Sequence, residues 1–391
     1  MKRITKFIYF GFASLALAWF ALSPPLNAQC PSDCGAGRNT AVGINALDSV
    51  TTGINNTAVG ANALTADTTG GYNVAIGSGA LAKDTTGFQN LAIGAGALAN
   101  NITGNFNMGI GFRALFMNTG GRNSAVGAAA LRNNTHASDN TAIGSTALRE
   151  NTTGEDNTAI GSAALAQNTM GSNNTAIGTF ALSSNTMGHE NTAIGRDALL
   201  QNTTGAGNTA TGHGALTNNI GADGNTANGF FALHDNSAGR ENTAIGQQAL
   251  AVNQADANTA IGFQALLNNT SGTRNNAVGK GALFSHLTGD FNNAVGAFAL
   301  NADTAGTGNN AFGDAALAAN TMGLQNTAMG DNALSSNNTG SGNTAVGQQA
   351  LSSNSAADNN TAIGRFALDN NTMESKCRLR FPSRVFCQHG Q

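Results

Sequence analysis

A nine-residue motif, Asn-Thr-Ala-Ile/Val-Gly-x-x-Ala-Leu, recurs twenty times in this chain, from Asn39 to the copy that begins at Asn360. Successive copies begin 17 residues apart, except that the units Asn107–Arg122 and Asn242–Ala257 are one residue shorter. A fixed short period is typical of a solenoid, in which each repeat forms one coil and contacts only its neighbours. The repeat therefore predicts a rod and argues against most enzyme classes. We number the positions of each coil from its Asn, position 1, to position 17.

Four positions never vary: Asn at position 1, Gly at position 5, Ala at position 8 and Leu at position 9. Alternation along a strand places positions 2 and 4 on one face and positions 3 and 5 on the other. The small residues at positions 3 and 5 let another backbone approach closely, as either a narrow solenoid interior or a tight subunit contact requires. We expect the Ile or Val found at position 4 in sixteen coils, together with Leu at position 9, to fill the apolar interior.

The polar positions predict corners and ladders. Asn at position 1 is expected to stack as an amide ladder and to adopt the left-handed backbone of a tight corner. The sequence Asn-Thr-x-Gly at positions 12–15, as in Asn151–Gly154, predicts a second turn whose glycine has a positive φ. Charged side chains in the repeats occur only at positions 6, 7, 10–12 and 15–17, so we expect these to be solvated and positions 1–5, 8 and 9 to be buried.

Two further observations favour an all-β fold. No proline lies between Asn39 and Met373, as expected where backbone N–H groups join hydrogen-bonded ladders. The regular glycines and turn sequences also leave no uninterrupted stretch for a helical repeat. The sequence thus predicts a β-solenoid of about twenty 17-residue coils, roughly 95 Å long at ~4.8 Å per coil.

The Ala-Ile-Gly core, as in Asn174–Leu182 (Asn-Thr-Ala-Ile-Gly-Thr-Phe-Ala-Leu), resembles the head repeats of trimeric autotransporter adhesins, also called YadA-like or haemagglutinin-type repeats. The resemblance covers Asn39–Met373 and is specific for architecture. It implies a left-handed parallel β-roll, assembled as a side-by-side homotrimer and displayed on a cell surface for attachment. The period of this chain is longer than that of those repeats, and no heptad stalk accompanies it.

The two ends differ from the repeats. Residues 1–28 read as a secretory signal peptide, with a basic start, the apolar run Phe7–Leu22 and a small residue, Ala28, at the cleavage site; the alternative is an uncleaved membrane anchor. Residues 29–38 are a predicted N-terminal cap, in which Cys30 and Cys34 are expected to form a local disulfide after export. Residues 374–391 are a basic non-repeat tail, interpreted as a truncated or frameshifted end or as a capping peptide.

Charge and residue spacing argue against several functions. Without the predicted signal, 15 Lys and Arg stand against 21 Asp and Glu, and no basic cluster lies in the repeats, which argues against a nucleic-acid partner. The histidines lie in different coils or in the tail and are expected to be solvated, so we expect no metal site. We also expect no cofactor and no catalytic activity.

Phenylalanines are the candidate functional residues. Seven occupy positions 6 or 7 and predict a discontinuous apolar stripe along one edge, either a subunit contact or an adhesive surface. These residues are Phe112, Phe180, Phe230, Phe231, Phe263, Phe298 and Phe366.

The sequence thus favours an exported structural or adhesion protein, secreted or associated with the cell surface or outer membrane. Its partners would be further copies of itself and an extracellular surface or host-matrix ligand. The alternatives are a tail-fibre-like appendage protein and an ice-binding β-solenoid, the latter because position 2 is Thr in thirteen coils.

Overall fold

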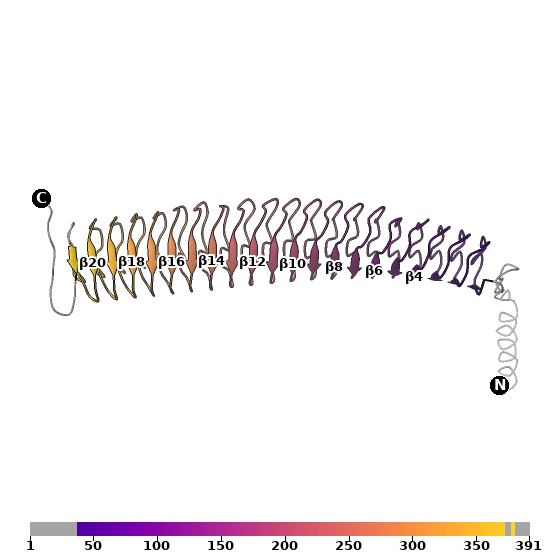
Figure 1. The fold of residues 1–391 in the computed structure, drawn as a ribbon, viewed down its shortest axis with the longest axis horizontal. Helices are drawn as coiled ribbons and strands as arrows, with labels where there is room; N and C mark the ends of the chain where they lie inside the picture. The colour runs from indigo at the N-terminus through magenta and orange to yellow at the C-terminus, as the bar shows by residue number, and fades with distance from the viewer. Residues whose placement is uncertain (1–36, 372–376, 380–391) are drawn as a thin grey trace, which may run out of the picture.

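The computed structural model describes residues 37–371 and 377–379. The predicted signal peptide, the pair Cys30 and Cys34, and most of the tail lie outside the described residues. The described chain is a long, gently bent rod (Figure 1). Each coil contributes one three-residue strand at positions 2–4, and each strand pairs in parallel with the strands of the neighbouring coils. The predicted all-β solenoid is confirmed, whereas its left-handed winding stays a prediction.

The strands are β1 (Thr40–Val42), β2 (Thr57–Val59), β3 (Val74–Ile76), β4 (Leu91–Ile93), β5 (Met108–Ile110), β6 (Ser124–Val126), β7 (Thr141–Ile143), β8 (Thr158–Ile160), β9 (Thr175–Ile177), β10 (Thr192–Ile194), β11 (Thr209–Thr211), β12 (Thr226–Asn228), β13 (Thr243–Ile245), β14 (Thr259–Ile261), β15 (Asn276–Val278), β16 (Asn293–Val295), β17 (Asn310–Phe312), β18 (Thr327–Met329), β19 (Thr344–Val346), β20 (Thr361–Ile363) and β21 (Cys377–Leu379).

The interior of the rod is narrow. In the ninth coil, Ala176 (position 3), Ala181 (position 8) and Leu182 (position 9) are fully buried, and the other complete coils repeat this pattern. The expectation that position 4 fills the interior was wrong, because Ile177 faces outward and is 37% exposed. The alternation was correct, but its inner face is the alanine face. Alanine there allows the opposite side of the coil to approach closely enough for one leucine per coil to fill the space.

Every leucine at position 9 has a left-handed backbone, with φ of 51° at Leu182. This conformation costs a residue that bears a Cβ about 1–2 kcal/mol. Burying a leucine side chain contributes about 1.5–3 kcal/mol, which offsets that strain. The backbone N–H of Leu182 also donates to the carbonyl of Ala198 in the next coil, at 2.9 Å. The corner is therefore held by packing and by inter-coil bonding together.

Two columns of buried asparagine run through the rod, at positions 1 and 12. The Nδ2 groups of Asn174 and Asn185 both donate to the carbonyl oxygen of Gly188, at 2.9 and 3.0 Å. Oδ1 of Asn174 accepts the backbone N–H of Asn191 at 3.0 Å, which links consecutive coils. The expected amide ladder is confirmed at position 1, but the left-handed corner residue is the one before it, such as Asn173 with φ of 60°.

Position 12 was expected to be solvated, and that expectation was wrong. Its side chains are fully buried in coils two to nineteen, including Asp67, Asp84, His286 and Asp303. In the ninth coil, Nδ2 of Asn185 donates to Oδ1 of Asn168 at 2.8 Å, so position 12 forms a second amide ladder. Such a ladder excludes water because each polar group finds its partner in the coil before or after it.

The glycine at position 15 serves a different purpose from the one expected. Gly188 is absent from the residues with positive φ, so the prediction of a positive φ there was wrong. A Cβ on Gly188 would lie 2.4 Å from the carbonyl oxygen of Gly205 and 2.4 Å from Oδ1 of Asn185. Close stacking of the coils, not turn geometry, therefore favours glycine at this position.

The backbone of the tail continues the sheet at one point. β21 pairs in parallel with β20, with Thr361 opposite Cys377 and Ile363 opposite Leu379. The offset of 16 residues equals that of the two shorter coils. Strand pairing thus extends beyond the last copy of the sequence motif.

Candidate interaction surface

The side chains at positions 2 and 4 form one continuous surface along the rod, which we call the outer face. Position 4 is apolar in eighteen coils; eleven of these side chains are between 36% and 45% exposed, and the other seven are half-buried. In-register pairing aligns Ile143, Ile160, Ile177 and Ile194 one above the other. The whole column is Val42, Val59, Ile76, Ile93, Ile110, Val126, Ile143, Ile160, Ile177, Ile194, Thr211, Asn228, Ile245, Ile261, Val278, Val295, Phe312, Met329, Val346 and Ile363.

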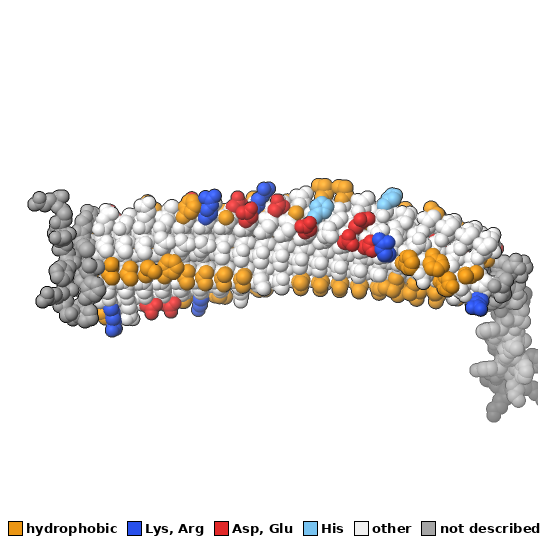
Figure 2. Space-filling model, in the orientation of Figure 1, with side chains coloured by type: hydrophobic (Ala, Val, Ile, Leu, Met, Phe, Trp, Pro, Cys, Tyr) orange, Lys and Arg blue, Asp and Glu red, His pale blue; other side chains and the backbone are white. Residues whose placement is uncertain are grey.

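The outer face is large enough for a protein interface. Figure 2 shows a hydrophobic band along the rod with a gap near its middle. Twenty coils at about 4.8 Å and a strand about 10 Å long give roughly 950 Å², compared with the about 800 Å² that each partner contributes to a standard interface. Only the position-4 column of this face is apolar, because position 2 is Thr, Ser or Asn in seventeen coils. Exposed apolar patches larger than a few hundred Å² mark interaction sites. The sequence shows this column, but its apolar character predicts a place in the interior, and that prediction is wrong.

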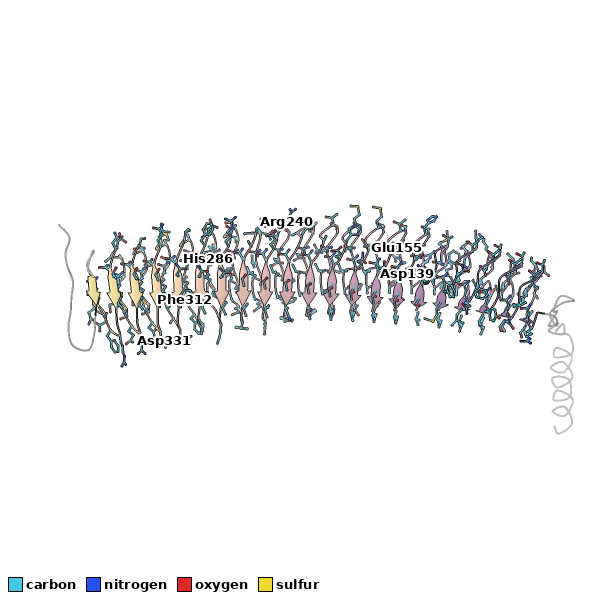
Figure 3. The ribbon with its side chains drawn as sticks, viewed as in Figure 1. Asp139, Glu155, Arg240, His286, Phe312 and Asp331 are labelled. Atoms are coloured by element: carbon cyan, nitrogen blue, oxygen red, sulfur yellow. The ribbon has the colours of Figure 1, made fainter. Side chains whose placement is uncertain are left out.

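The seven predicted phenylalanines lie at the corner that follows each strand, at positions 6 and 7, which we call the phenylalanine corner. Phe112, Phe180, Phe230, Phe263 and Phe298 are exposed, whereas Phe231 and Phe366 are half-buried. In Figure 3, Asp331 at position 6 lies below the strands, whereas Glu155 and Arg240 at position 16 lie above them. The corner is thus distinct from the charged residues that precede each strand.

The structure brings only some of these phenylalanines together. Phe230 and Phe231 have ring centroids 4.1 Å apart, and His213 lies 5.4 Å from both rings. Phe263 and Phe298 line a shallow pocket of about 280 Å³ with Phe284, a position-10 residue that the stripe had not included. The remaining three lie in separate coils, so the corner is a series of patches. Its two predicted roles, a subunit contact or an adhesive surface, both stay predictions.

The buried column at position 12 contains two consecutive acids. Oδ1 of Asp67 accepts the backbone N–H of Gly70 at 2.9 Å, and Oδ1 of Asp84 accepts Nδ2 of Asn101 at 3.0 Å. When both acids are ionised, neither carboxylate carries a hydrogen to donate. The ladder therefore lacks a hydrogen bond between Asp67 and Asp84. Burial raises the pKa of Asp67 to about 7, and burial together with the charge of Asp67 raises the pKa of Asp84 to about 7.

We expect Asp84→Asn to stabilise the N-terminal coils above neutral pH. The folded pKa values are raised, so the stability that the protonated acids contribute is complete below the unfolded value of 3.8 and is lost as pH rises through about 7. The gain should be about 1–3 kcal/mol at pH 8.5 and close to zero near pH 3.5. Chemical denaturation at the two pH values measures it, and an equal gain at both would contradict the pH-dependent origin.

His286 was expected to be solvated, but it replaces asparagine in the same buried column (Figure 3). Its Nδ1 lies 2.7 Å from Oδ2 of Asp303, and its Nε2 lies 2.7 Å from the carbonyl oxygen of Gly289. No ring nitrogen remains for Oδ1 of Asn269 in the preceding coil, which is buried without a hydrogen-bond partner. His286 therefore takes the structural place of an asparagine in the ladder, and it leaves the amide oxygen of Asn269 without a hydrogen bond.

Within residues 37–371 and 377–379, no group of three or more His, Cys, Asp or Glu side chains could hold a metal ion. Those residues also form no helix that is long and apolar enough to cross a bilayer. The chain matches no protein-family model, and no curated protein matches its sequence. The outer face and the phenylalanine corner therefore stand as the candidate functional surfaces on their geometry alone.

Proposed function

We propose that this protein is an exported, rod-like structural and adhesion module whose copies associate side by side through the outer face. The observation that supports it most is the in-register column of exposed and half-buried apolar side chains at position 4, interrupted only at Thr211 and Asn228, in coils whose own interior is already complete. Covering such a face with a second copy removes apolar surface from water and so lowers the free energy. A homotrimer, as in the adhesin heads that the repeat resembles, would bury three such faces around one axis.

In this arrangement the phenylalanine corner and the charged residues at positions 16 and 17 remain outside the assembly. These are the positions at which the coils differ most from one another, so they can vary without disturbing the ladders. We propose that this variable surface makes the attachment contacts with an extracellular surface or matrix ligand. Phenylalanine patches separated by charged and polar side chains suit a surface that binds through many weak contacts.

Ile160→Glu with Ile194→Glu tests the assembly. Two carboxylates on each outer face would meet their equivalents in the neighbouring copies, and we expect self-association to weaken by roughly a hundredfold or more. Light scattering after size-exclusion chromatography measures the mass. Circular dichroism verifies the fold, which should persist because both side chains already face outward.

The matched variant changes the phenylalanine corner, with Phe180, Phe230 and Phe263 each replaced by serine. Under the proposal it keeps the oligomeric mass but adsorbs less to polystyrene beads and to immobilised matrix proteins. If the serine variant dissociates while the glutamate variant does not, the phenylalanine corner is the subunit contact and the outer face is not. A monomeric native protein at high concentration would overturn the assembly altogether.

Ice binding is a second candidate that the structure makes more specific. Eight consecutive coils, from Thr141 to Thr259, present threonine at position 2 on the outer face beside the aliphatic column. A regular rank of this kind is a feature that ice-binding solenoids share. Measurable thermal hysteresis that disappears in Thr175→Leu with Thr192→Leu would favour this function. Adhesion without hysteresis would favour the first proposal.

A further inference from the structure

The apolar column at position 4 has one polar interruption. At position 4, Thr211 in β11 and Asn228 in β12 replace the aliphatic residue, and every other coil is apolar there. Asn228 is exposed, and its side-chain amide has no hydrogen-bond partner among the described residues. Ten apolar coils precede the interruption and eight follow it, so it lies off centre. With aliphatic residues at these two positions, the column would bury more apolar surface on association.

A uniform column has no means of fixing how two copies align. Identical coils could slide past each other by whole coils, or run in opposite directions, with nearly the same apolar contact. A single polar position removes this degeneracy, because a buried amide opposite an aliphatic side chain loses its hydrogen bonds with water and gains none. One buried asparagine fixes register and partner number in coiled coils by the same physics, at some expense of stability.

The position of the interruption distinguishes the possible alignments. In a parallel, in-register assembly, Asn228 meets Asn228 and Thr211 meets Thr211, and amides can hydrogen-bond to one another. In a fully overlapped antiparallel pair, the twelfth coil faces the ninth, so Asn228 meets Ile177 and Thr211 meets Ile194. A parallel slip of one coil places Asn228 against Ile245. Among the arrangements that overlap all twenty coils, only the parallel, in-register one pairs every polar group on this column. An antiparallel pair displaced by two coils also sets Thr211 against Asn228, but it leaves two coils of each copy uncovered.

We propose that Asn228, together with Thr211, sets the direction and register in which copies of this chain associate, so that the assembly is parallel and in register. The proposal rests on the self-association through the outer face described above, and it names the residues that make that association specific. The partner is a second copy of the chain, since only an identical face places an amide at the same height.

The native chain contains the reporters needed for a test. Lys83 in the third coil and Lys280 in the fifteenth are the lysines within residues 37–371. In a parallel, in-register assembly they are twelve coils apart, about 58 Å, beyond a short amine-reactive cross-linker. In a fully overlapped antiparallel assembly they lie within three coils of each other, about 15 Å along the axis. Mixing unlabelled and nitrogen-15-labelled protein identifies links between copies by mass spectrometry.

For the native protein we expect Lys280–Lys280 links between copies and no intermolecular Lys83–Lys280 links. In Thr211→Ile with Asn228→Ile the assembly should persist, while intermolecular Lys83–Lys280 links rise by roughly tenfold because antiparallel pairing no longer buries polar groups against aliphatic ones. X-ray scattering should show a broader distribution of rod lengths, as slipped pairs form. Asn276→Thr, a polar exchange at position 2, is the matched control and should leave the links unchanged.

Two results would overturn the proposal while leaving self-association intact: mixed links in the native assembly, or Lys280–Lys280 links alone in the double isoleucine variant. A native chain that stays monomeric in light scattering, with no links between copies, would overturn the association and the register together. The light-scattering mass and the link pattern therefore separate the two failures.

Discussion

Replacing Gly178 by alanine is expected to destabilise the middle of the rod by roughly 3–5 kcal/mol, from backbone strain and overpacking together. Gly178, at position 5, has a φ of 135°, and a Cβ there would lie 2.5 Å from the carbonyl oxygen and 2.6 Å from the carbonyl carbon of Gly195. Both contacts are with the backbone of the next coil, so no side-chain rotation relieves them. The coils must separate instead.

Gly207→Ala is the control for this change. Gly207 also has a positive φ, of 65°, but a Cβ there meets nothing within 4 Å. Ala257, which like Gly207 is the last residue before the Asn of the next coil, has φ of 61°, so alanine is tolerated there. We expect a cost of about 1 kcal/mol. Chemical denaturation and limited proteolysis measure both variants, and equal losses would show that conformation rather than close stacking requires the glycine at position 5.

Replacing Asn174 by alanine should cost about 2–4 kcal/mol, because it leaves a buried donor unsatisfied and removes packing. The backbone N–H of Asn191 donates to Oδ1 of Asn174 and would have no acceptor. The carbonyl oxygen of Gly188 keeps its bond from Asn185, so the damage falls mainly on the link between coils. Unfolding by denaturant, followed by tryptic digestion to locate the opened coils, measures the effect.

The adjacent Asn173 provides the comparison. Its side chain is exposed and its φ is 60°, and glycine occupies this position in other coils, including Gly207 and Gly224. Asn173→Gly should therefore change the stability by no more than about 0.5 kcal/mol. A loss at Asn173 as large as that at Asn174 would mean that asparagine acts through backbone conformation at both positions, and not through the buried ladder.

The period alone was sufficient to predict a stacked β-solenoid, and composition at positions 3, 8 and 9 correctly indicated small or apolar buried residues. The sequence did not determine which face of each strand points into the rod. Ile177 and Ala176 alternate, and either could have pointed inward on hydrophobicity alone. The interior is too narrow for a branched residue at position 4, because Leu182 already fills it. That constraint depends on the three-dimensional width of the coil, which no residue count provides.

The second asparagine column could have been found. Position 12 is Asn in fifteen of the twenty coils, a frequency that a solvated position in a variable turn does not need. Residues such as Asn151 also fit the role of turn formers that the sequence predicts, since asparagine favours turns as well. Asp67, Asp84 and His286 made the position look variable and charged. The left-handed backbone at leucines such as Leu182 left no trace in the sequence, because leucine rarely adopts it.

Within residues 37–371, each strand contacts only the strands of the coils before and after it, so no contact among these residues holds the two ends of the rod together. Under tension applied along the axis, coils should open one at a time from an end. Each opened coil replaces about 4.8 Å of rod with about 56 Å of extended chain, at about 3.3 Å for each residue of a 17-residue unit. A tether built this way lengthens under load before it breaks, and its reach under force is set by the number of coils.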